Sequence, residues 1–246
     1  KTCVPFINFF DGFRTSHEYH KVELMDMEDV RPLVDEADVK RFRDRALTPE
    51  RPVTRGTAEN PETFFTHREA CNPYYDQVPE VVENYLAEIS KITGREYHLF
   101  SYNGAEDAER MIILMGSATE AAREAIDYLN ANGEKVGMIS VHLYRPFSVK
   151  HLLASVPKTV KKIAVLDRTK EPGANGEPLY LDVKDAYYDV EDRPVIVGGR
   201  YGLGSRDTTP AQIISVFNNL ALPEPKNHFT VGIVDDVTFT SLPQVE

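Results

Sequence analysis

The sequence is poor in cysteine. Its 246 residues include two, Cys3 and Cys71, and neither belongs to a Cys-x-x-Cys pair. One disulfide between them is chemically allowed, but nothing in the sequence requires it, and a reduced cytoplasmic setting is expected. Because a [4Fe–4S] cluster takes four thiolates, this chain cannot hold one by itself.

Long apolar runs and a basic face are also missing. No apolar stretch approaches the roughly 18 residues that span a bilayer, so no membrane partner is expected. The formal net charge is −11 at pH 7, which argues against nucleic acid as a main partner. The amino terminus does not resemble a signal peptide and lacks an initiator Met. That abrupt start suggests a piece of a longer chain.

Motifs of the common catalytic and metal sites are absent as well. His17 and His20 are the nearest histidines, and no further ligand type completes a metal array around them, so no metal site is expected. Ser16, His17 and Glu18 have the residue types of a triad. Triad members are brought together by the fold rather than by adjacency, so we interpret them as a polar segment bracing a loop or a domain interface. No catalytic residue is predicted.

The clearest structural signal lies in residues 110–132. Residues 111–115 are all apolar, which is typical of a strand buried on both faces. After Gly116, apolar positions recur at helical spacing. Ser117 and Glu120 have the spacing of a capping box, and Gly133 is expected to end the helix. A strand, turn and helix of this kind open a doubly wound unit, in which ligands bind at the carboxyl ends of strands.

Strands and helices alternate through the second half of the chain. Strands are predicted over 136–143, 162–167, 194–198, 229–234 and 237–240, and helices over 148–154, 179–187 and 210–220. Ser148 and Thr209 are placed to cap two of these helices. The expected fold class is therefore α/β, with a doubly wound, mostly parallel sheet preceded by an irregular segment.

The first hundred residues give weaker signals. Strand-like runs cover 4–10, 22–24 and 97–102, the last as an edge strand, and helices are predicted over 27–30, 36–46 and 78–93. Gly94 is expected to end the last helix. Residues 48–79 contain several prolines and aromatics without a clear period, so they are predicted to form a connector rather than a core element.

Two places remain as candidates for ligand binding. Residues 198–205 are rich in glycine but lack both the G-x-G-x-x-G and the P-loop spacing, so we interpret their glycines as permitting positive φ and close backbone approach. Ends of strands in one sheet also offer Ser117, Arg145 and Arg168, where an anion or a partner domain could meet them. Capping and interface contacts are the preferred alternative. Arg200, within the glycine-rich stretch, is a further weak candidate.

Four long motifs resemble the pyruvate:ferredoxin (flavodoxin) oxidoreductase family. They read PFINFFDGFRTSHE at 5–18, VHLYRPF at 141–147, VLDRTKEPG at 165–173 and GRYGLGS at 199–205, in the family's order. The resemblance implies a large multidomain parent, usually a homodimer, that oxidatively decarboxylates pyruvate to acetyl-CoA. Such enzymes use thiamine diphosphate and CoA and pass electrons through [4Fe–4S] clusters to ferredoxin or flavodoxin.

The same resemblance implies a division of this chain. Residues 1–50 would be the end of the pyrimidine-binding domain, 51–98 a connector with one helix, and 99–246 a domain similar to the carboxyl-terminal domain of transketolases. The family's other domains are missing from the sequence, so no catalytic residue is carried over and no cofactor is expected to bind this piece alone.

Three functional interpretations stay open. We favour a structural, interdomain module without its own active site, in which Ser117 is a helix cap and the strand ends form a docking face. One alternative is a CoA- or anion-contacting module that uses Ser117, Arg145, Arg168 or Arg200. The other is a free-standing nucleotide-binding α/β domain.

Overall fold

The computed structural model describes residues 1–53, 56 and 58–245. The chain divides into two compact units. The first comprises Lys1–Asn8 and His20–Leu99, and the second comprises Phe9–Tyr19 and Phe100–Glu246. The segment Phe9–Tyr19 therefore belongs to the second unit, although it lies far from Phe100 in the sequence.

The described part of the first unit is helical. It contains α2 (Met27–Val30), the 3-10 turn η1 (Arg31–Leu33), α3 (Glu36–Arg43), α4 (Pro61–Glu69), α5 (Asn72–Asp76) and α6 (Val78–Thr93). Asp35 caps α3 by accepting hydrogen bonds from the Ala37 and Asp38 N–H groups. Helix α6 ends at Thr93 and is followed by Gly94 as its C-cap. Gly94 has a φ of 70°, which glycine adopts without strain because it has no side chain. The predicted helices over 27–30 and 78–93 are confirmed, and the helix predicted over 36–46 ends at Arg43.

Several predictions for the first hundred residues are wrong. Residues 4–10 and 22–24 are not strands, because an extended run becomes a strand only where another strand satisfies its N–H and C=O groups. Residues 48–79 contain α4, α5 and the start of α6, whereas 54, 55 and 57 lie outside the described residues. Their prolines indicated a break, but Pro61 and Pro73 stand in the first turns of helices, where no N–H is needed.

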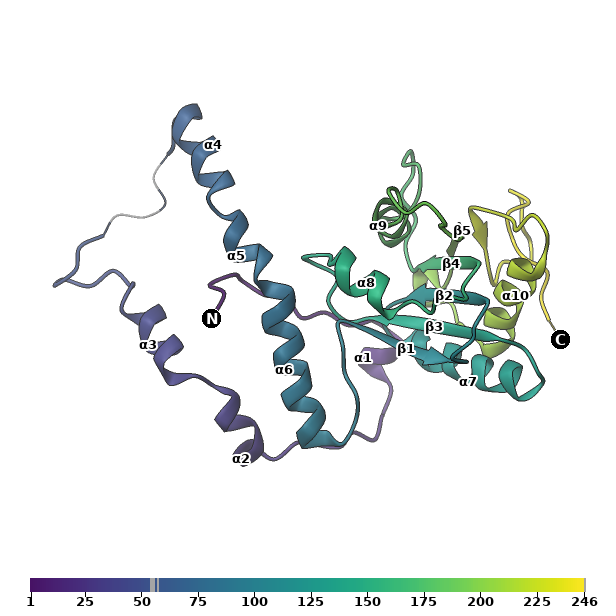
Figure 1. The fold of residues 1–246 in the computed structure, drawn as a ribbon, viewed down its shortest axis with the longest axis horizontal. Coiled ribbons are helices and arrows are strands. Elements are labelled where there is room, and N and C mark those ends of the chain that lie inside the picture. Colours follow the sequence, from purple (N-terminus) through teal and green to yellow (C-terminus); the bar gives the residue numbers. More distant parts are fainter. Residues whose placement is uncertain (54–55, 57, 246) are drawn as a thin grey trace. The chain divides into compact units, whose positions relative to one another are not determined.

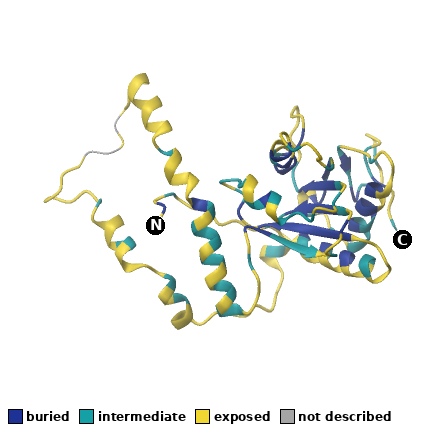
Figure 2. Ribbon diagram, in the orientation of Figure 1, coloured by how far each residue is buried: buried dark blue, intermediate teal, exposed yellow. Residues whose placement is uncertain are grey.

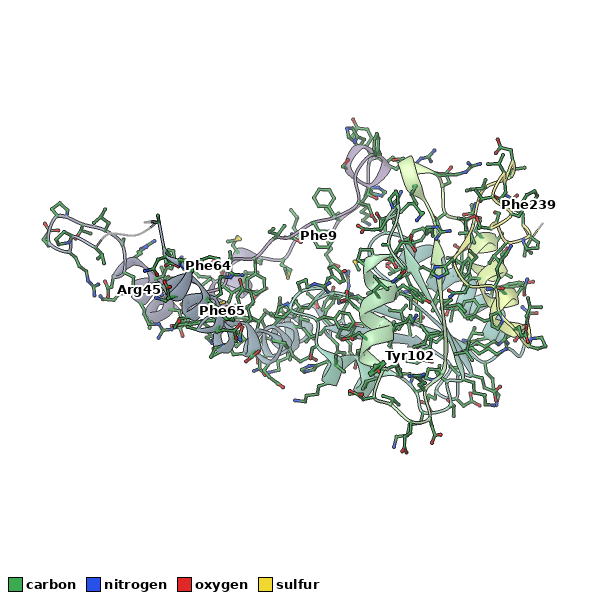
Figure 3. All side chains as sticks on the ribbon, turned by 90° about the horizontal axis from the view of Figure 1, so that it is seen from above. Phe9, Arg45, Phe64, Phe65, Tyr102 and Phe239 are labelled. Atoms are coloured by element: carbon green, nitrogen blue, oxygen red, sulfur yellow. The ribbon has the colours of Figure 1, made fainter. Side chains whose placement is uncertain are left out.

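Helix α4 has no buried residue, and this is a second reason why the sequence pattern did not predict it. Its Phe64 and Phe65 side chains are both exposed (Figure 3). Figure 2 shows the contrast with the central strands of the second unit, which are almost wholly buried. A helix without an apolar stripe gives no helical period to detect.

The second unit is built on a six-stranded sheet (Figure 1). Its strands are β1 (Phe100–Gly104), β2 (Arg110–Leu114), β3 (Val136–Val141), β4 (Lys162–Asp167), β5 (Val195–Arg200) and β6 (Phe229–Thr230), in the order β1-β3-β2-β4-β5-β6. Every neighbouring pair is parallel except β1 with β3. The predicted α/β class with a mostly parallel, doubly wound sheet is confirmed, and β1 is the edge strand expected near 97–102.

Helices cover both faces of this sheet. They are α7 (Ala118–Ala131), α8 (Val149–Ser155), α9 (Pro178–Ala186) and α10 (Pro210–Ala221), with the short α1 (Arg14–His17) and η2 (Leu203–Ser205) in loops. Ile112 and Leu114 share one core cluster with α7 and α10. Met111 and Ile113 are equally buried and face the other side, since side chains alternate along a strand. In Figure 1, α8 and α9 lie on that side.

The ends of two predicted elements differ in detail. Thr209 forms the capping box of α10 with Gln212, as predicted for its cap. Ser148 precedes α8, but its hydroxyl lies 2.7 Å from His151 Nδ1 instead of accepting a backbone N–H. Residues 237–240 are not a strand. Instead, the Thr230 N–H donates to the Thr240 carbonyl at 3.0 Å, next to an isolated bridge between Thr230 and Ser241.

Two glycines of β5 let aromatic rings lie directly on the sheet. A Cβ atom at Gly198 would lie 2.9 Å from the Tyr180 ring, and one at Gly199 would lie 2.2 Å from the Phe229 ring. Both rings are buried. These two glycines therefore permit close approach, as interpreted from the sequence.

Replacing Gly199 by Ala is expected to lower the free energy of unfolding by about 1–3 kcal/mol, because the new methyl group overpacks against the buried Phe229 ring. The double variant Gly199→Ala/Phe229→Leu should lose less than the sum of the two single variants, as measured by urea unfolding. Gly12→Ala is the control, since a Cβ there meets nothing within 4 Å. Strict additivity would contradict the steric explanation.

Candidate functional site

The carboxyl ends of β2 and β4 meet at the topological switch point of the sheet. These strands are neighbours. After β2 the chain runs through α7 to β3, whereas after β4 it runs through α9 to β5 on the opposite side. Doubly wound folds place ligands in the crevice that this divergence leaves. The Gly116–Ser117 turn and Arg168 flank the crevice here.

A carboxylate from a distant segment occupies this crevice. The Ser117 backbone N–H donates to Asp11 Oδ2 at 2.5 Å, and Arg168 Nη1 lies 3.4 Å from Asp11 Oδ1. The side chains of Asp11 and Arg168 are 19% and 26% exposed. Asp11 thus stands at the N-terminus of α7, where unpaired N–H groups and the helix dipole favour an anion.

Gly116 makes room for that carboxylate. Its φ is 82°, a backbone conformation that side chains disfavour, and a Cβ atom would lie 2.8 Å from Asp11 Oδ2. A residue with a side chain at this position would therefore be strained and would push Asp11 away from the turn. The glycine of the turn is explained by its contact with Asp11.

The prediction that Ser117 caps α7 through a capping box is wrong. Ser117 has helical backbone angles, and its side chain makes no capping hydrogen bond. Its hydroxyl accepts instead from Arg168 Nη1 at 3.4 Å, while its own N–H is bound by Asp11. The sequence pattern predicted that the Ser117 side chain would accept a hydrogen bond at the start of α7. The Asp11 carboxylate, from outside the helix, is the acceptor there instead.

Arg168 connects three segments. Besides Asp11 and Ser117, its Nε donates to the Gly202 carbonyl at 2.9 Å, so the glycine-rich loop after β5 is tied to the end of β4. Burial disfavours the ionised form of Asp11. The hydrogen bonds from Ser117 and the charge of Arg168 outweigh that effect and hold the Asp11 pKa below its ordinary value. A second ion pair, Arg14 to Asp207 at 3.0 Å, binds the same segment to the loop before α10.

Asp167, the last residue of β4, serves the neighbouring helix. Its carboxylate accepts hydrogen bonds from the N–H groups of Leu179 (3.0 Å) and Tyr180 (3.1 Å) in the first turn of α9. Burial is the main cause that raises its pKa to about 6, with the negative charges of Glu177 and Asp182 adding to it, against the effect of those hydrogen bonds. Asp167 therefore stabilises the start of α9.

The other two arginine candidates lie elsewhere. Arg145 Nη2 is 2.8 Å from Asp182 Oδ2, and its guanidinium stacks 4.0 Å from the Tyr144 ring centroid. Arg200 Nη1 is 3.5 Å from Glu177 Oε2, and its Nη2 donates to the His228 carbonyl at 2.8 Å. The structure thus brings Ser117 and Arg168 together and gives Arg145 and Arg200 acidic partners of their own. Sequence reasoning singled out neither Asp11 nor Glu177, because no local pattern marks a partner that distant residues supply.

The cluster around Ser16 and His17 is a local turn. Ser16 Oγ lies 2.7 Å from His17 Nδ1, and both side chains contact the carbonyl of Phe13, the residue that precedes α1. Their hydrogen bonds close a single helical turn in an exposed segment.

Within 1–53, 56 and 58–245, no three His, Cys, Asp or Glu side chains are grouped so as to hold a metal ion. Cys3 and Cys71 are free thiols. Two thiols do not fit the four-thiolate requirement of an iron–sulfur cluster. Nor does any helix in the described part of the chain have the length and apolarity to cross a membrane.

Two family models match the chain, one in each half. Residues 1–87 match the model described as pyruvate flavodoxin/ferredoxin oxidoreductase, thiamine diphosphate-binding. Residues 108–213 match the model described as pyruvate:ferredoxin oxidoreductase core domain II. Together they cover residues 1–87 and the four strands from β2 to β5.

Curated relatives agree with these models. The chain is 63% identical over 99% of its length to a pyruvate-flavodoxin oxidoreductase of Enterobacter agglomerans and 58% identical over 100% to one of Klebsiella pneumoniae. It is 54% identical over 98% to a pyruvate:ferredoxin oxidoreductase of Moorella thermoacetica. The chain spans 21% of the length of each of these three relatives.

A solved structure is also similar, at a greater distance. It is a 2-oxoglutarate:ferredoxin oxidoreductase from Magnetococcus marinus with 2-oxoglutarate, coenzyme A and succinyl-CoA bound, and it is 19% identical with a TM-score of 0.44. The match covers 66% of this chain and 24% of that one. The two family models and the relatives that span nearly all of its residues lead to one conclusion: the chain belongs to the pyruvate:ferredoxin (flavodoxin) oxidoreductase family.

Proposed function

We propose that this chain is a structural, interdomain module of an enzyme that oxidatively decarboxylates pyruvate to acetyl-CoA and CO2. The names of its relatives support pyruvate as the substrate and flavodoxin or ferredoxin as the electron acceptor. The complete enzyme would be a cytoplasmic homodimer, with thiamine diphosphate, [4Fe–4S] clusters and CoA acting in its remaining domains.

The observation that carries the proposal is the Asp11 carboxylate in the switch-point crevice. Ligands of doubly wound folds bind at this position. Here the Ser117 N–H and the Arg168 guanidinium are already bound by Asp11 of the same chain. The crevice therefore serves to dock the segment Phe9–Tyr19, and a cofactor phosphate would have to displace a bound carboxylate.

The donor set of the chain supports the same role. The diphosphate of thiamine diphosphate is normally held through a divalent cation, which needs oxygen ligands. The described residues group no such ligands, and two cysteines cannot hold a [4Fe–4S] cluster. The cofactors of the enzyme would be held by other domains, and this chain would contribute fixed surfaces between them.

The proposed division into residues 1–50, 51–98 and 99–246 draws partial support from the compact units. The sheet and its covering helices begin at Phe100, next to the proposed boundary. The segment Phe9–Tyr19 adds to that domain from the amino-terminal side. We therefore propose that this segment folds with the carboxyl-terminal domain rather than with the rest of residues 1–50.

Asp11→Asn is expected to lower the free energy of unfolding of the second unit by about 1–3 kcal/mol at pH 7, because it removes a charge that is hydrogen-bonded and largely shielded from water. The Asp11 pKa is lower in the folded protein than its ordinary 3.8. Its stabilisation is therefore complete above pH 3.8 and is lost as the pH falls through the folded pKa. Urea unfolding of both proteins at pH 7 and at about pH 3 should show the difference shrinking.

The matched control is Asp207→Asn, which removes the ion pair between Arg14 of the same segment and the loop before α10. Arg14 and Asp207 are 62% and 58% exposed, so this change should cost less than about 0.5 kcal/mol. Equal losses for the two variants would argue against a special role for Asp11.

The chain alone is expected to reduce no viologen dye when it is mixed with pyruvate, CoA, thiamine diphosphate and Mg²⁺. The residues that the structure describes group no metal ligands, and two thiols cannot hold a [4Fe–4S] cluster, so we expect electrons to have no path to the dye. Absorbance of the reduced dye measures the outcome. A full-length pyruvate-flavodoxin oxidoreductase is the positive control, and reduction above the blank by this chain would overturn the structural role.

A further inference from the structure

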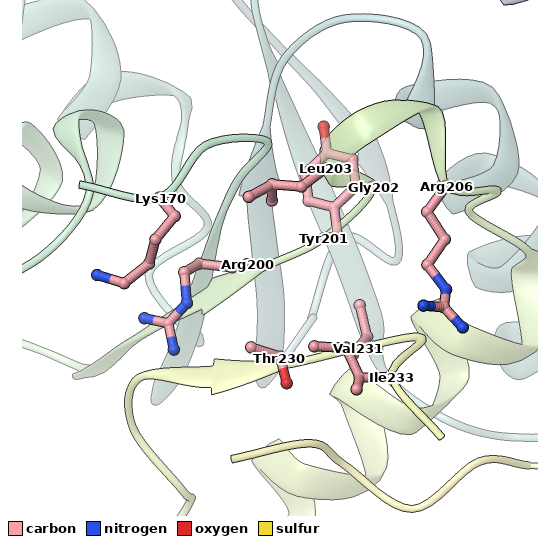
Figure 4. A pocket seen from close by; sticks show the side chains of 9 residues that line it. All are labelled: Lys170, Arg200, Tyr201, Gly202, Leu203, Arg206, Thr230, Val231 and Ile233. Carbon is pink, nitrogen blue, oxygen red and sulfur yellow. The ribbon is translucent and has the colours of Figure 1, made fainter. Parts of the chain in front are cut away.

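The second unit has another concave site, next to the glycine-rich loop. A pocket of ≈ 340 Å³ opens between that loop and β6 (Figure 4). Lys170, Arg200 and Arg206 are the charged residues that line it. Leu203, Val231 and Ile233 make an apolar wall. A pocket of this size, with an apolar wall and a few charged groups, suits a small molecule.

Cations gather at this pocket although the chain as a whole is acidic, with a net charge of −11. Two of them are held from within by Glu177, whose side chain is 2% exposed: Lys170 Nζ and Arg200 Nη1 each lie 3.5 Å from its carboxylate. Arg200 is 11% exposed and also donates to the His228 carbonyl. The buried carboxylate thus fixes two cations in place, and with Arg206 the pocket keeps an excess of positive charge.

Arg206 differs from the other two cations. It is exposed, and in the described part of the chain its guanidinium meets neither a carboxylate nor a carbonyl oxygen. Its backbone N–H closes the η2 turn by donating to the Leu203 carbonyl at 3.2 Å, which anchors its main chain. Figure 4 shows Lys170 and Arg200 on one side of the pocket and Arg206 on the other, with Leu203, Val231 and Ile233 between them.

We propose that this pocket binds a small dicarboxylate. One carboxylate would lie beside the Lys170 ammonium and the positive charge of Arg200. The other would pair with Arg206, because an exposed guanidinium binds a carboxylate through paired, charge-assisted hydrogen bonds. The methylene chain between them would lie against Leu203, Val231 and Ile233. This inference concerns a site separate from the Asp11 crevice and goes beyond the structural role proposed above.

The test compares three probes of one length on the full 246-residue chain. Glutarate carries two carboxylates, valerate carries one, and glutaramide carries none. Calorimetric titration should give measurable glutarate binding, about tenfold or more weaker binding of valerate, and no binding of glutaramide, since each charged hydrogen-bonded pair is worth about a factor of ten. Amide resonances of residues 200–206 and 230–233 should shift with glutarate.

Variants identify the site. Arg206→Gln should weaken glutarate binding by about tenfold or more and leave the fold intact, because that side chain is exposed. Arg123→Gln, an equal charge change on the exposed side of α7, is the control and should leave binding unchanged. Circular dichroism checks that both variants fold.

Four results would overturn the proposal. They are the absence of a glutarate response up to about 20 mM, equal binding of glutarate and glutaramide, equal effects of Arg206→Gln and Arg123→Gln, and displacement of glutarate by inorganic phosphate at equal concentration. The last result would reduce the pocket to a general anion site. None of them bears on the docking role of Asp11, which the unfolding experiment tests separately.

Discussion

Water is excluded from both faces of the sheet's centre, and the arrangement of the second unit follows from that constraint. Residues Met111 to Leu114 of β2 are completely buried, so helices have to cover them on both sides. The chain must therefore leave β2 and β4 toward opposite faces, which opens a crevice between their carboxyl ends. The N-terminus of α7 points its unpaired N–H groups at that crevice, where they and the helix dipole favour an anion. Asp11 supplies the acceptor.

Carboxylates from other segments satisfy the first turns of two helices in this unit, with opposite effects on their acidity. Asp11 accepts from α7 and lies beside Arg168, and its pKa is lowered. Asp167 accepts from α9 but is 6% exposed. Its burial, together with the negative charges of Glu177 and Asp182, raises its pKa to about 6. The same hydrogen-bond geometry thus leads to different electrostatics, because burial and neighbouring charge decide the balance.

Much of the sheet could be predicted because its signals are local. The apolar runs that form β2 and β4 and the apolar stripe of α6 are properties of a few consecutive residues. That Ser117 and Arg168 meet also follows from topology alone, since both come directly after neighbouring parallel strands. Helices α4 and α5 were missed because their prolines read as breaks although they stand in first turns.

The details of the site could not be predicted, for a different reason. Asp11 is 106 residues from Ser117. The partners of Arg145 and Arg200, which are Asp182 and Glu177, are likewise distant in the sequence. A sequence pattern states which side chains end a strand, but the choice among several acidic partners depends on how loops fold over the sheet. Ser117 is a residue type that often caps helices, yet its side chain makes no capping hydrogen bond. The Asp11 carboxylate accepts the hydrogen bond at the start of α7 instead.

The membership of Phe9–Tyr19 in the second unit has a consequence for how this protein can be divided. The chain passes between units after Asn8, after Tyr19 and after Leu99, so each unit is assembled from separate stretches of sequence. A gene fragment that encodes residues 100–246 would contain every strand of the sheet but would lack Asp11. Cleavage at the single junction after Leu99 would leave the first unit whole in the amino-terminal polypeptide, but it would separate Phe9–Tyr19 from the rest of the second unit. Recombination between relatives would keep each unit from a single parent only if crossovers fell after Asn8, after Tyr19 and after Leu99.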